Sequence, residues 1–219
     1  MTTVTTPATT PSTVSRRARA ATVGAVLWTL SSGIWAISEM EDQEFGSLRF
    51  VAVAVAWWVF MVLPAALLIL GHAALRTALG PAAGRVGSVG LVVAAAGIGA
   101  LGLGIGIEVA SMSVGGGEVA LGHVILLVGY LVSVVGALLL GIMIIRRRRD
   151  GLSRAAGWLL VLAVPLGIGI GLLGSAVAPE NDAVFWAALT VPTGIAWVLL
   201  GASLRPVVRP APAEFTTAD

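Results

Sequence analysis

Six long apolar segments constrain the fold of this chain more than any other feature of its sequence. They cover residues 20–38, 50–71, 86–107, 119–145, 155–178 and 183–204. A helix needs about 20 mostly apolar residues to cross the hydrocarbon of a bilayer, which is roughly 30 Å thick. Continuous apolar runs of this length lack the period-two alternation that indicates a strand. The sequence therefore predicts an all-α polytopic transmembrane helix bundle with six spans.

The composition agrees with a chain that lies in a membrane. Of its 219 residues, 58% are hydrophobic and 11% are charged, whereas about a quarter of the residues in a soluble domain are charged. Cysteine is absent from the sequence, which excludes disulfides, thiolate metal sites and cysteine nucleophiles. Basic residues exceed acidic ones by only 13 to 11, so the predicted partner is the lipid bilayer and not a nucleic acid.

The predicted loops alternate in charge, and this alternation predicts the orientation. Twelve of the thirteen basic residues, all of them arginine, lie on one side of the six spans, and only Arg49 lies on the other. Retained arginine marks the cytoplasmic side of a membrane. We therefore expect a multi-pass protein of the bacterial cytoplasmic (inner) membrane with both termini in the cytoplasm. The residues that carry this prediction, here called the topology arginines, are Arg76, Arg85, Arg146, Arg147, Arg148, Arg149, Arg154 and Arg205.

Both ends of the chain are predicted to lie outside the bundle. Residues 1–19 are rich in threonine, proline and serine and contain few residues that a core would bury. Segments of this composition bury too little apolar surface to offset the entropy lost on ordering. We therefore predict a disordered cytoplasmic tail at 1–19, a six-helix transmembrane domain at 20–204 and a second disordered cytoplasmic tail at 205–219.

Small residues indicate where the predicted helices pack. Helices in lipid associate through close approach of their backbones, which glycine permits. One set recurs every seven residues on the fourth span, and two pairs spaced by four residues lie on the third and fifth spans. These helix-packing glycines are Gly102, Gly106, Gly122, Gly129, Gly136, Gly167 and Gly171. We expect the three helices to pack against one another or against a second copy.

Three prolines fall at a similar depth in their spans. Pro64, Pro165 and Pro192 each lie 11 to 13 residues from an arginine at the predicted inner end. At about 1.5 Å per residue, this spacing places them near the bilayer midplane. Proline removes a backbone hydrogen bond and bends a helix, so this midplane proline layer is consistent with a hinge or the outline of a cavity. The alternative is that it reflects only the frequency of proline in transmembrane helices.

The even-numbered spans end alike, which raises the question of an internal repeat. Each ends in a leucine-rich run, a glycine and then an arginine, and the glycines are Gly71, Gly141 and Gly201. Three tandem helical hairpins descended from one would produce this pattern. The membrane itself also imposes leucine within spans and arginine at inner ends. The sequence leaves both explanations open.

One group of ionisable residues lies near the predicted outer face. Glu108 ends the third span, Glu118 opens the fourth, and His123 follows near the outer end of the fourth. If they converge, these side chains form a cation or proton site. The alternative is that they are separately hydrated at a helix boundary. The second histidine, His72, lies at the inner end of the second span, too far away for the two to share a metal or a haem.

The sequence contains little that indicates catalysis. Two G-x-G-x-x-G matches, at 97–102 and 169–174, lie inside apolar spans, whereas a dinucleotide-binding fingerprint needs a strand before it. The central half of each predicted span lacks ionisable residues, which argues against ion-coupled transport. We therefore predict no enzymatic activity, no cofactor and no metal.

With Leu-Leu-Gly span ends, arginine-rich inner loops and short acidic outer loops, the region from Arg16 to Arg205 resembles uncharacterised six-span integral membrane proteins of actinobacteria. The resemblance implies a fold and no activity. Our first hypothesis is a non-enzymatic protein that acts through helix packing with itself, as a homo-oligomer, or with other membrane proteins. The alternative is a small permease for an uncharged or lipophilic solute. An interior cavity that reaches the prolines and is lined by Thr29, Ser133 or Thr193 would favour this alternative.

Overall fold

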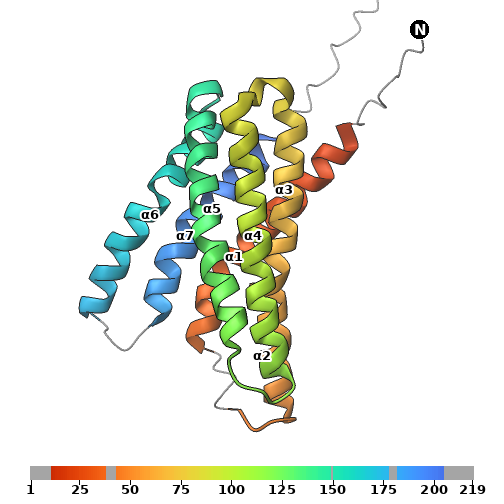
Figure 1. Ribbon diagram of the computed structural model, residues 1–219, viewed down its shortest axis with the longest axis vertical. Coiled ribbons are helices and arrows are strands. Elements are labelled where there is room, and N and C mark those ends of the chain that lie inside the picture. Colours follow the sequence, from red (N-terminus) through yellow and green to blue (C-terminus); the bar gives the residue numbers. More distant parts are fainter. Residues whose placement is uncertain (1–10, 38–42, 149, 178–181, 205–219) are drawn as a thin grey trace, which may run out of the picture.

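The computed structural model describes residues 11–37, 43–148, 150–177 and 182–204. Within these residues the regular elements are all helical (Figure 1). In chain order they are α1 (Pro11–Ile37), α2 (Leu48–Trp57), the π-helical turn η1 (Trp58–Val62), α3 (Leu63–Leu79), the 3-10 turn η2 (Gly80–Ala83), α4 (Gly84–Ser113), α5 (Ala120–Arg147), α6 (Gly151–Val177) and α7 (Asp182–Ser203). The predicted all-α class is confirmed.

Among the described residues, four helical stretches are long and apolar enough to cross a membrane. They are Leu48–Ser113, Ala120–Arg147, Gly151–Gly174 and Trp186–Ser203. The first stretch contains two arms, α2–η1–α3 and α4, which run side by side and turn at η2 (Figure 1). Gly80 and Gly84 flank this turn with φ angles of 49° and 61°, values that glycine adopts without the steric cost of a side chain. The helix α1 is not among the four stretches.

Helix α1 begins earlier than predicted. It starts at Pro11 and not at residue 20, so part of the segment predicted as a disordered tail is helical. The reason is packing against α7, because Ala18 is fully buried. A Cβ built on Gly201 would lie 3.0 Å from the carbonyl oxygen of Ala18. The remaining parts of the two predicted tails, 1–10 and 205–219, lie outside the described residues.

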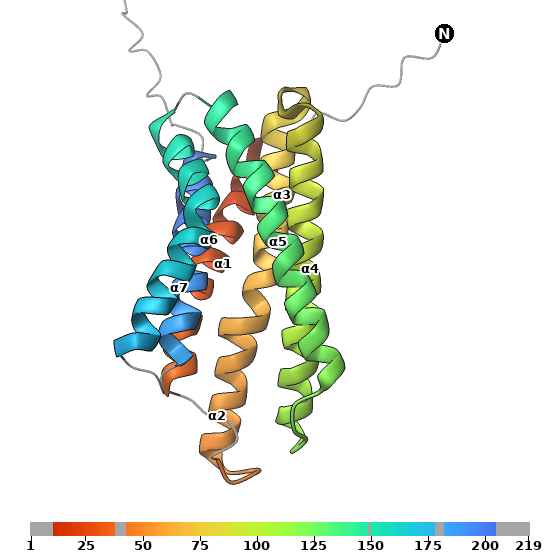
Figure 2. The same ribbon diagram turned by 60° about the vertical axis from the view of Figure 1, so that its left-hand side comes forward.

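The helices pack both against their neighbours in the chain and against helices that are distant in the sequence. Antiparallel pairs form between α4 and α5 and between α6 and α7, while α1 packs against both α3 and α7 (Figures 1 and 2). The small residues of α1 make this central position feasible, because Ala21 and Ala25 are almost completely buried. The pairing agrees with three tandem hairpins, although common descent of the hairpins stays a hypothesis.

The closest helix contact joins α4 to α5 along a line of glycines. A Cβ added to Gly129 would overlap the backbone nitrogen of Leu101, and one added to Gly136 would overlap the backbone of Ala94. From the other side, a Cβ on Gly97 would overlap the backbone of Ser133. The structure adds Gly97 and Gly104 on α4 to the predicted stripe on α5. We call the five glycines the glycine seam: Gly97, Gly104, Gly122, Gly129 and Gly136.

The other predicted glycines have different roles. Gly102 faces α3 and not α5, because an added Cβ would overlap the side chain of Ala65. Gly106 is less confined, with Val62 Cγ1 at 3.8 Å from the position of an added Cβ. Gly167 and Gly171 are buried on α6. Helix α4, the third predicted span, therefore packs on α5 through residues other than the predicted pair Gly102 and Gly106.

The described topology arginines of two predicted inner loops lie at the same end of the bundle. Arg76 and Arg85 flank the η2 turn, and a guanidinium nitrogen of Arg147 lies 3.9 Å from the position of a Cβ on Gly84. The end of α5 therefore adjoins the α3–α4 turn. Arg149 and Arg205 lie outside the described residues.

Replacement of Gly129 by alanine tests the glycine seam. The added methyl group meets backbone atoms of α4 that do not move independently, so we expect a loss of about 1 to 3 kcal/mol in the free energy of unfolding. The measurement is unfolding by sodium dodecyl sulfate in mixed micelles, followed by tryptophan fluorescence. Gly169→Ala is the matched control, because nothing lies within 4 Å of its added Cβ. Equal stability of the two variants would contradict this view of the seam.

Candidate functional site

An interior cavity lies where α1, α3, α4, α5, α6 and α7 meet. Its volume is about 60 Å³, which provides space for at least two water molecules. Most of its wall is aliphatic, and the described lining residues include no aspartate, glutamate, arginine or lysine. The side chains in the wall that carry polar atoms are Trp28, His72, Tyr130, Ser133, Thr193 and Trp197. The cavity is therefore uncharged and mostly apolar, with a small number of polar atoms.

Each of the three predicted midplane prolines has a chain neighbour that lines this cavity. Ala65, Val164 and Thr193 line it, and each is the residue next to Pro64, Pro165 or Pro192 in the chain. Pro165 and Pro192 lie inside α6 and α7. Pro64 follows the π-helical turn η1, which widens the helix locally.

Each proline lacks the N–H that would complete a helical hydrogen bond. The prolines themselves are not among the lining residues, and Pro165 is exposed. The role of the proline layer therefore stays a prediction.

Two hydroxyl groups at the cavity use their protons on their own helices. Ser133 Oγ donates to the carbonyl oxygen of Tyr130 at 2.7 Å, and Thr193 Oγ1 donates to that of Thr190 at 3.0 Å. Trp28 Nε1 then donates to Thr193 Oγ1 at 3.3 Å. A hydroxyl whose proton is engaged retains acceptor capacity. Ser133 therefore contributes an acceptor to the wall, whereas Tyr130 and Trp197 contribute an O–H and an N–H.

His72 is the most unusual group in the wall. Its side chain is 3% exposed, and its ring packs against Trp197 with centroids 4.2 Å apart. Nδ1 lies 2.9 Å from the carbonyl oxygen of Leu68. A carbonyl only accepts, so Nδ1 carries the proton of the neutral ring and Nε2 presents a lone pair. Among the described residues, Nε2 of His72 is the one buried side-chain nitrogen or oxygen without a hydrogen-bond partner.

The sequence named Thr29, Ser133 and Thr193 as hydroxyls that would favour transport if they lined an interior cavity. Ser133 and Thr193 line this cavity. Thr29 is not among its lining residues, because its hydroxyl donates to the carbonyl oxygen of Ala25 at 2.8 Å and contacts Gly194. His72 was placed at the inner end of a span that ends at residue 71. In the structure α3 continues to Leu79, which encloses the imidazole. Its position as the sole histidine within this apolar helix was the available signal.

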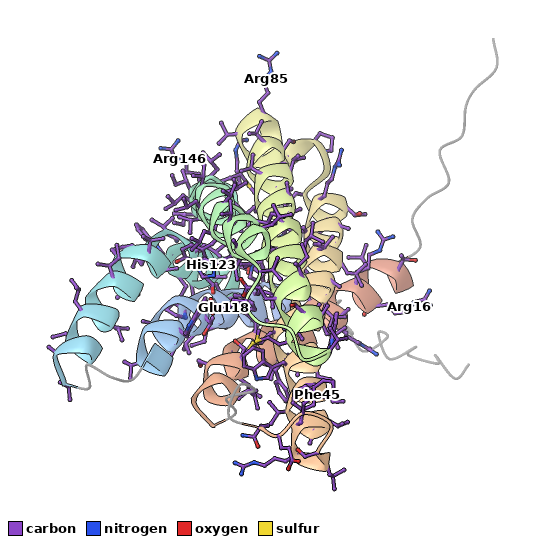
Figure 3. The ribbon with its side chains drawn as sticks, turned by 60° about the horizontal axis from the view of Figure 1, so that its bottom comes forward. Arg16, Phe45, Arg85, Glu118, His123 and Arg146 are labelled. Carbon is purple, nitrogen blue, oxygen red and sulfur yellow. The ribbon has the colours of Figure 1, made fainter. Side chains whose placement is uncertain are left out.

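The outer polar cluster forms only in part. His123 Nδ1 lies 3.2 Å from Glu108 Oε1, with side chains 54% and 13% exposed. Glu118 is exposed on the loop that leads from α4 to α5, and Figure 3 shows it and His123 at the end of the bundle that comes forward. Within the described ranges, no group of three or more histidine, cysteine, aspartate or glutamate side chains is arranged to hold a metal ion. The pair is an exposed electrostatic contact between two helices.

At the opposite end, one topology arginine is engaged by its neighbours. Arg148 Nε lies 3.1 Å from Asp150 Oδ2 and 3.2 Å from Ser153 Oγ. Asp150 Oδ1 also accepts from the backbone N–H of Ser153 at 2.8 Å, which is the interaction of a helix N-cap. Burial acts to raise the pKa of Asp150, but the hydrogen bonds from Ser153 and the charge of Arg148 outweigh it and lower that pKa.

The geometry provides a small interior cavity, a contact between His123 and Glu108 at one end of the bundle and the capped start of α6 at the other. Of these, only the cavity combines enclosure, polar atoms and contributions from six helices, so it is the candidate functional site. Comparisons with protein-family models, with curated proteins and with solved structures found no match. The functional interpretation therefore rests on the cavity itself.

Replacement of Asp150 by alanine removes the cap of α6. We expect a loss of about 1 kcal/mol in the free energy of unfolding at neutral pH, the usual effect of removing an N-cap. The folded-state pKa of Asp150 is lowered below 3.8, so its stabilisation is complete above that pH and is lost as the pH falls through the lowered pKa.

The measurement is the free energy of unfolding of the unchanged protein and of Asp150→Ala in mixed micelles, at a series of pH values from neutral to about pH 3 that brackets the ordinary carboxyl pKa. The difference in this free energy between the two proteins should become smaller as the pH falls. Glu118→Ala, at an exposed carboxylate of the other end, is the control and should leave stability unchanged. If the difference in the free energy of unfolding between the two proteins were as large in acid as at neutral pH, the charge of Asp150 would not be the source of the stabilisation.

Proposed function

We propose that this chain is a six-span integral membrane protein of the bacterial cytoplasmic membrane, oriented with its arginine-rich end in the cytoplasm. Two observations support the proposal. Four stretches have the length and apolarity of spanning helices, and one of them folds back at η2. Arg76, Arg85 and Arg147 lie at a common end of the bundle, as expected if they remain on one side of a bilayer.

Within this membrane protein, we propose that the interior cavity binds a small uncharged solute and lets it pass between the two sides. The observation that carries the proposal is an uncharged, mostly apolar interior cavity with a few polar atoms, whose lining includes a chain neighbour of each of the three prolines. Uncharged chemistry follows from the lining, because an ion would lose its hydration without gaining a countercharge. Small size follows from the volume of about 60 Å³, since a benzene-binding cavity measures about 150 Å³. The proposed activity is permeation without chemical conversion.

The same structure weakens the support for action through helix packing with partners. That hypothesis rested on glycine stripes available for association. In the structure, Gly129 and Gly136 contact α4, and Gly102 contacts α3. These close-contact surfaces are therefore occupied within a single chain. A permease is the function that the geometry supports best.

A cavity-filling variant tests permeation. Ala163 is 5% exposed and lines the cavity, so Ala163→Leu places three additional carbon atoms at or within it. We expect solute entry to fall toward the rate of protein-free vesicles. The measurement is stopped-flow light scattering of proteoliposomes challenged with glycerol, urea or ethanol.

The control is Ala66→Leu, the same substitution at an exposed position of α3, which should conduct as the unchanged protein does. Thermal unfolding of both variants establishes that each is folded. If all three solutes entered proteoliposomes with the unchanged protein no faster than they enter protein-free vesicles, the proposed function would be contradicted.

Reporter fusions test the orientation. A fluorescent protein that matures only in the cytoplasm, fused after residue 204, should fluoresce. Alkaline phosphatase, which is active only outside the cytoplasm, should be active when inserted at Gly117 in the loop between α4 and α5. The reciprocal fusions serve as controls and should be silent. The reverse pattern would contradict the orientation but leave the cavity argument intact.

A further inference from the structure

The unpaired nitrogen of His72 determines which solute fits the cavity. A buried acceptor without a partner is uncommon in folded proteins, because its lost hydration is not replaced. Nε2 of His72 is such an acceptor, and His72 lines the cavity. We propose that Nε2 of His72 accepts a hydrogen bond from a neutral ligand that carries an O–H or N–H group. This inference rests on the proposed function and specifies its substrate class.

The protonation of the ring determines the direction of this hydrogen bond. Nδ1 is committed as a donor to the carbonyl oxygen of Leu68, so a neutral imidazole has only its Nε2 lone pair left to offer. A second proton on the ring would place a positive charge in a wall whose described residues include no carboxylate, which is unfavourable for a buried group. Nε2 therefore selects donors, and a solute with acceptors only leaves it unsatisfied.

The hydroxyl of Ser133 agrees with this selection, while Tyr130 and Trp197 place an O–H and an N–H in the same wall. The protons of Ser133 and Thr193 are engaged with backbone carbonyl oxygens, so Ser133 Oγ offers a second acceptor on the α5 side of the cavity. Thr193 Oγ1 already accepts from Trp28. A ligand with one or two donor groups and a short apolar remainder matches such a wall. Short alcohols, small amides and water itself share this chemistry.

The chain is well suited to a direct test, because it contains only two histidines. The full chain is labelled with ¹⁵N-histidine in lipid nanodiscs, and His123→Gln assigns the two imidazoles. The probes are ethanol and dimethyl ether, which contain the same atoms but differ in that only ethanol donates a hydrogen bond. Long-range ¹H–¹⁵N spectra report the tautomer and the hydrogen bonding of each ring nitrogen.

We expect His72 to carry its proton on Nδ1, and we expect its Nε2 resonance to move saturably with ethanol and not with dimethyl ether. An Nε2 resonance that is already hydrogen-bonded without a probe and unaffected by ethanol would identify water as the donor. An Nε2 resonance that stays at the position of an unbonded nitrogen in all samples would overturn the proposal. A proton on Nε2 would overturn it as well.

Flux measurements separate this inference from the proposed function. His72→Leu removes the acceptor and should slow entry of the conducted solute about five- to tenfold, the effect of one hydrogen bond. His72→Gln retains an acceptor oxygen and should restore most of the rate, which a purely structural role would not predict. Thermal unfolding shows whether each variant is folded. Flux that persists unchanged in His72→Leu would keep the permease and overturn the role of His72. A spectroscopic response to ethanol without any flux would keep the binding site and overturn permeation.

Discussion

Contact between helix backbones at glycine is the interaction on which the bundle depends. In lipid, leucine gains little from leaving its surroundings, so helices associate where their backbones approach closely. The glycine seam provides this approach between residues 94–108 of α4 and 122–136 of α5. It also fixes the cavity wall, because Gly97 contacts the backbone of Ser133. A packing contact thereby sets the position of a polar group at the candidate site.

The cavity lies between the glycine-packed pair α4 and α5 and three helices that contain proline. Glycine lets α4 and α5 approach closely, whereas proline removes a helical hydrogen bond from α3, α6 and α7. Ala65, Val164 and Thr193, each beside one of these prolines in the chain, line the cavity. An enclosed space in an apolar bundle stays dry unless its wall is polar. His72 and Ser133 provide that polarity, which makes the cavity suited to a small neutral donor.

Much of this architecture was accessible from the sequence because the membrane imposes strong rules. The apolar segments predicted the helices to within a few residues at most boundaries, since span length is set by bilayer thickness. The seven-residue spacing on α5 predicted a packing face that the structure uses. The matching glycines on α4, Gly97 and Gly104, follow the same spacing but were missed. They are embedded among many other glycines in that helix, so several faces looked equally suited to contact.

The sequence by itself determined the helical class, the clustering of arginine in alternate loops and the set of prolines that share a depth. Each follows from a property of one segment, namely its length, charge or spacing. Only the tertiary structure decided that Gly129 meets α4, that Gly102 meets α3 and that Glu108 reaches His123. It also decided that His72 lines a cavity and that its Nε2 is buried without a hydrogen-bond partner. Periodicity shows which residues share a face of a helix, whereas the partner of that face depends on how all the helices pack together.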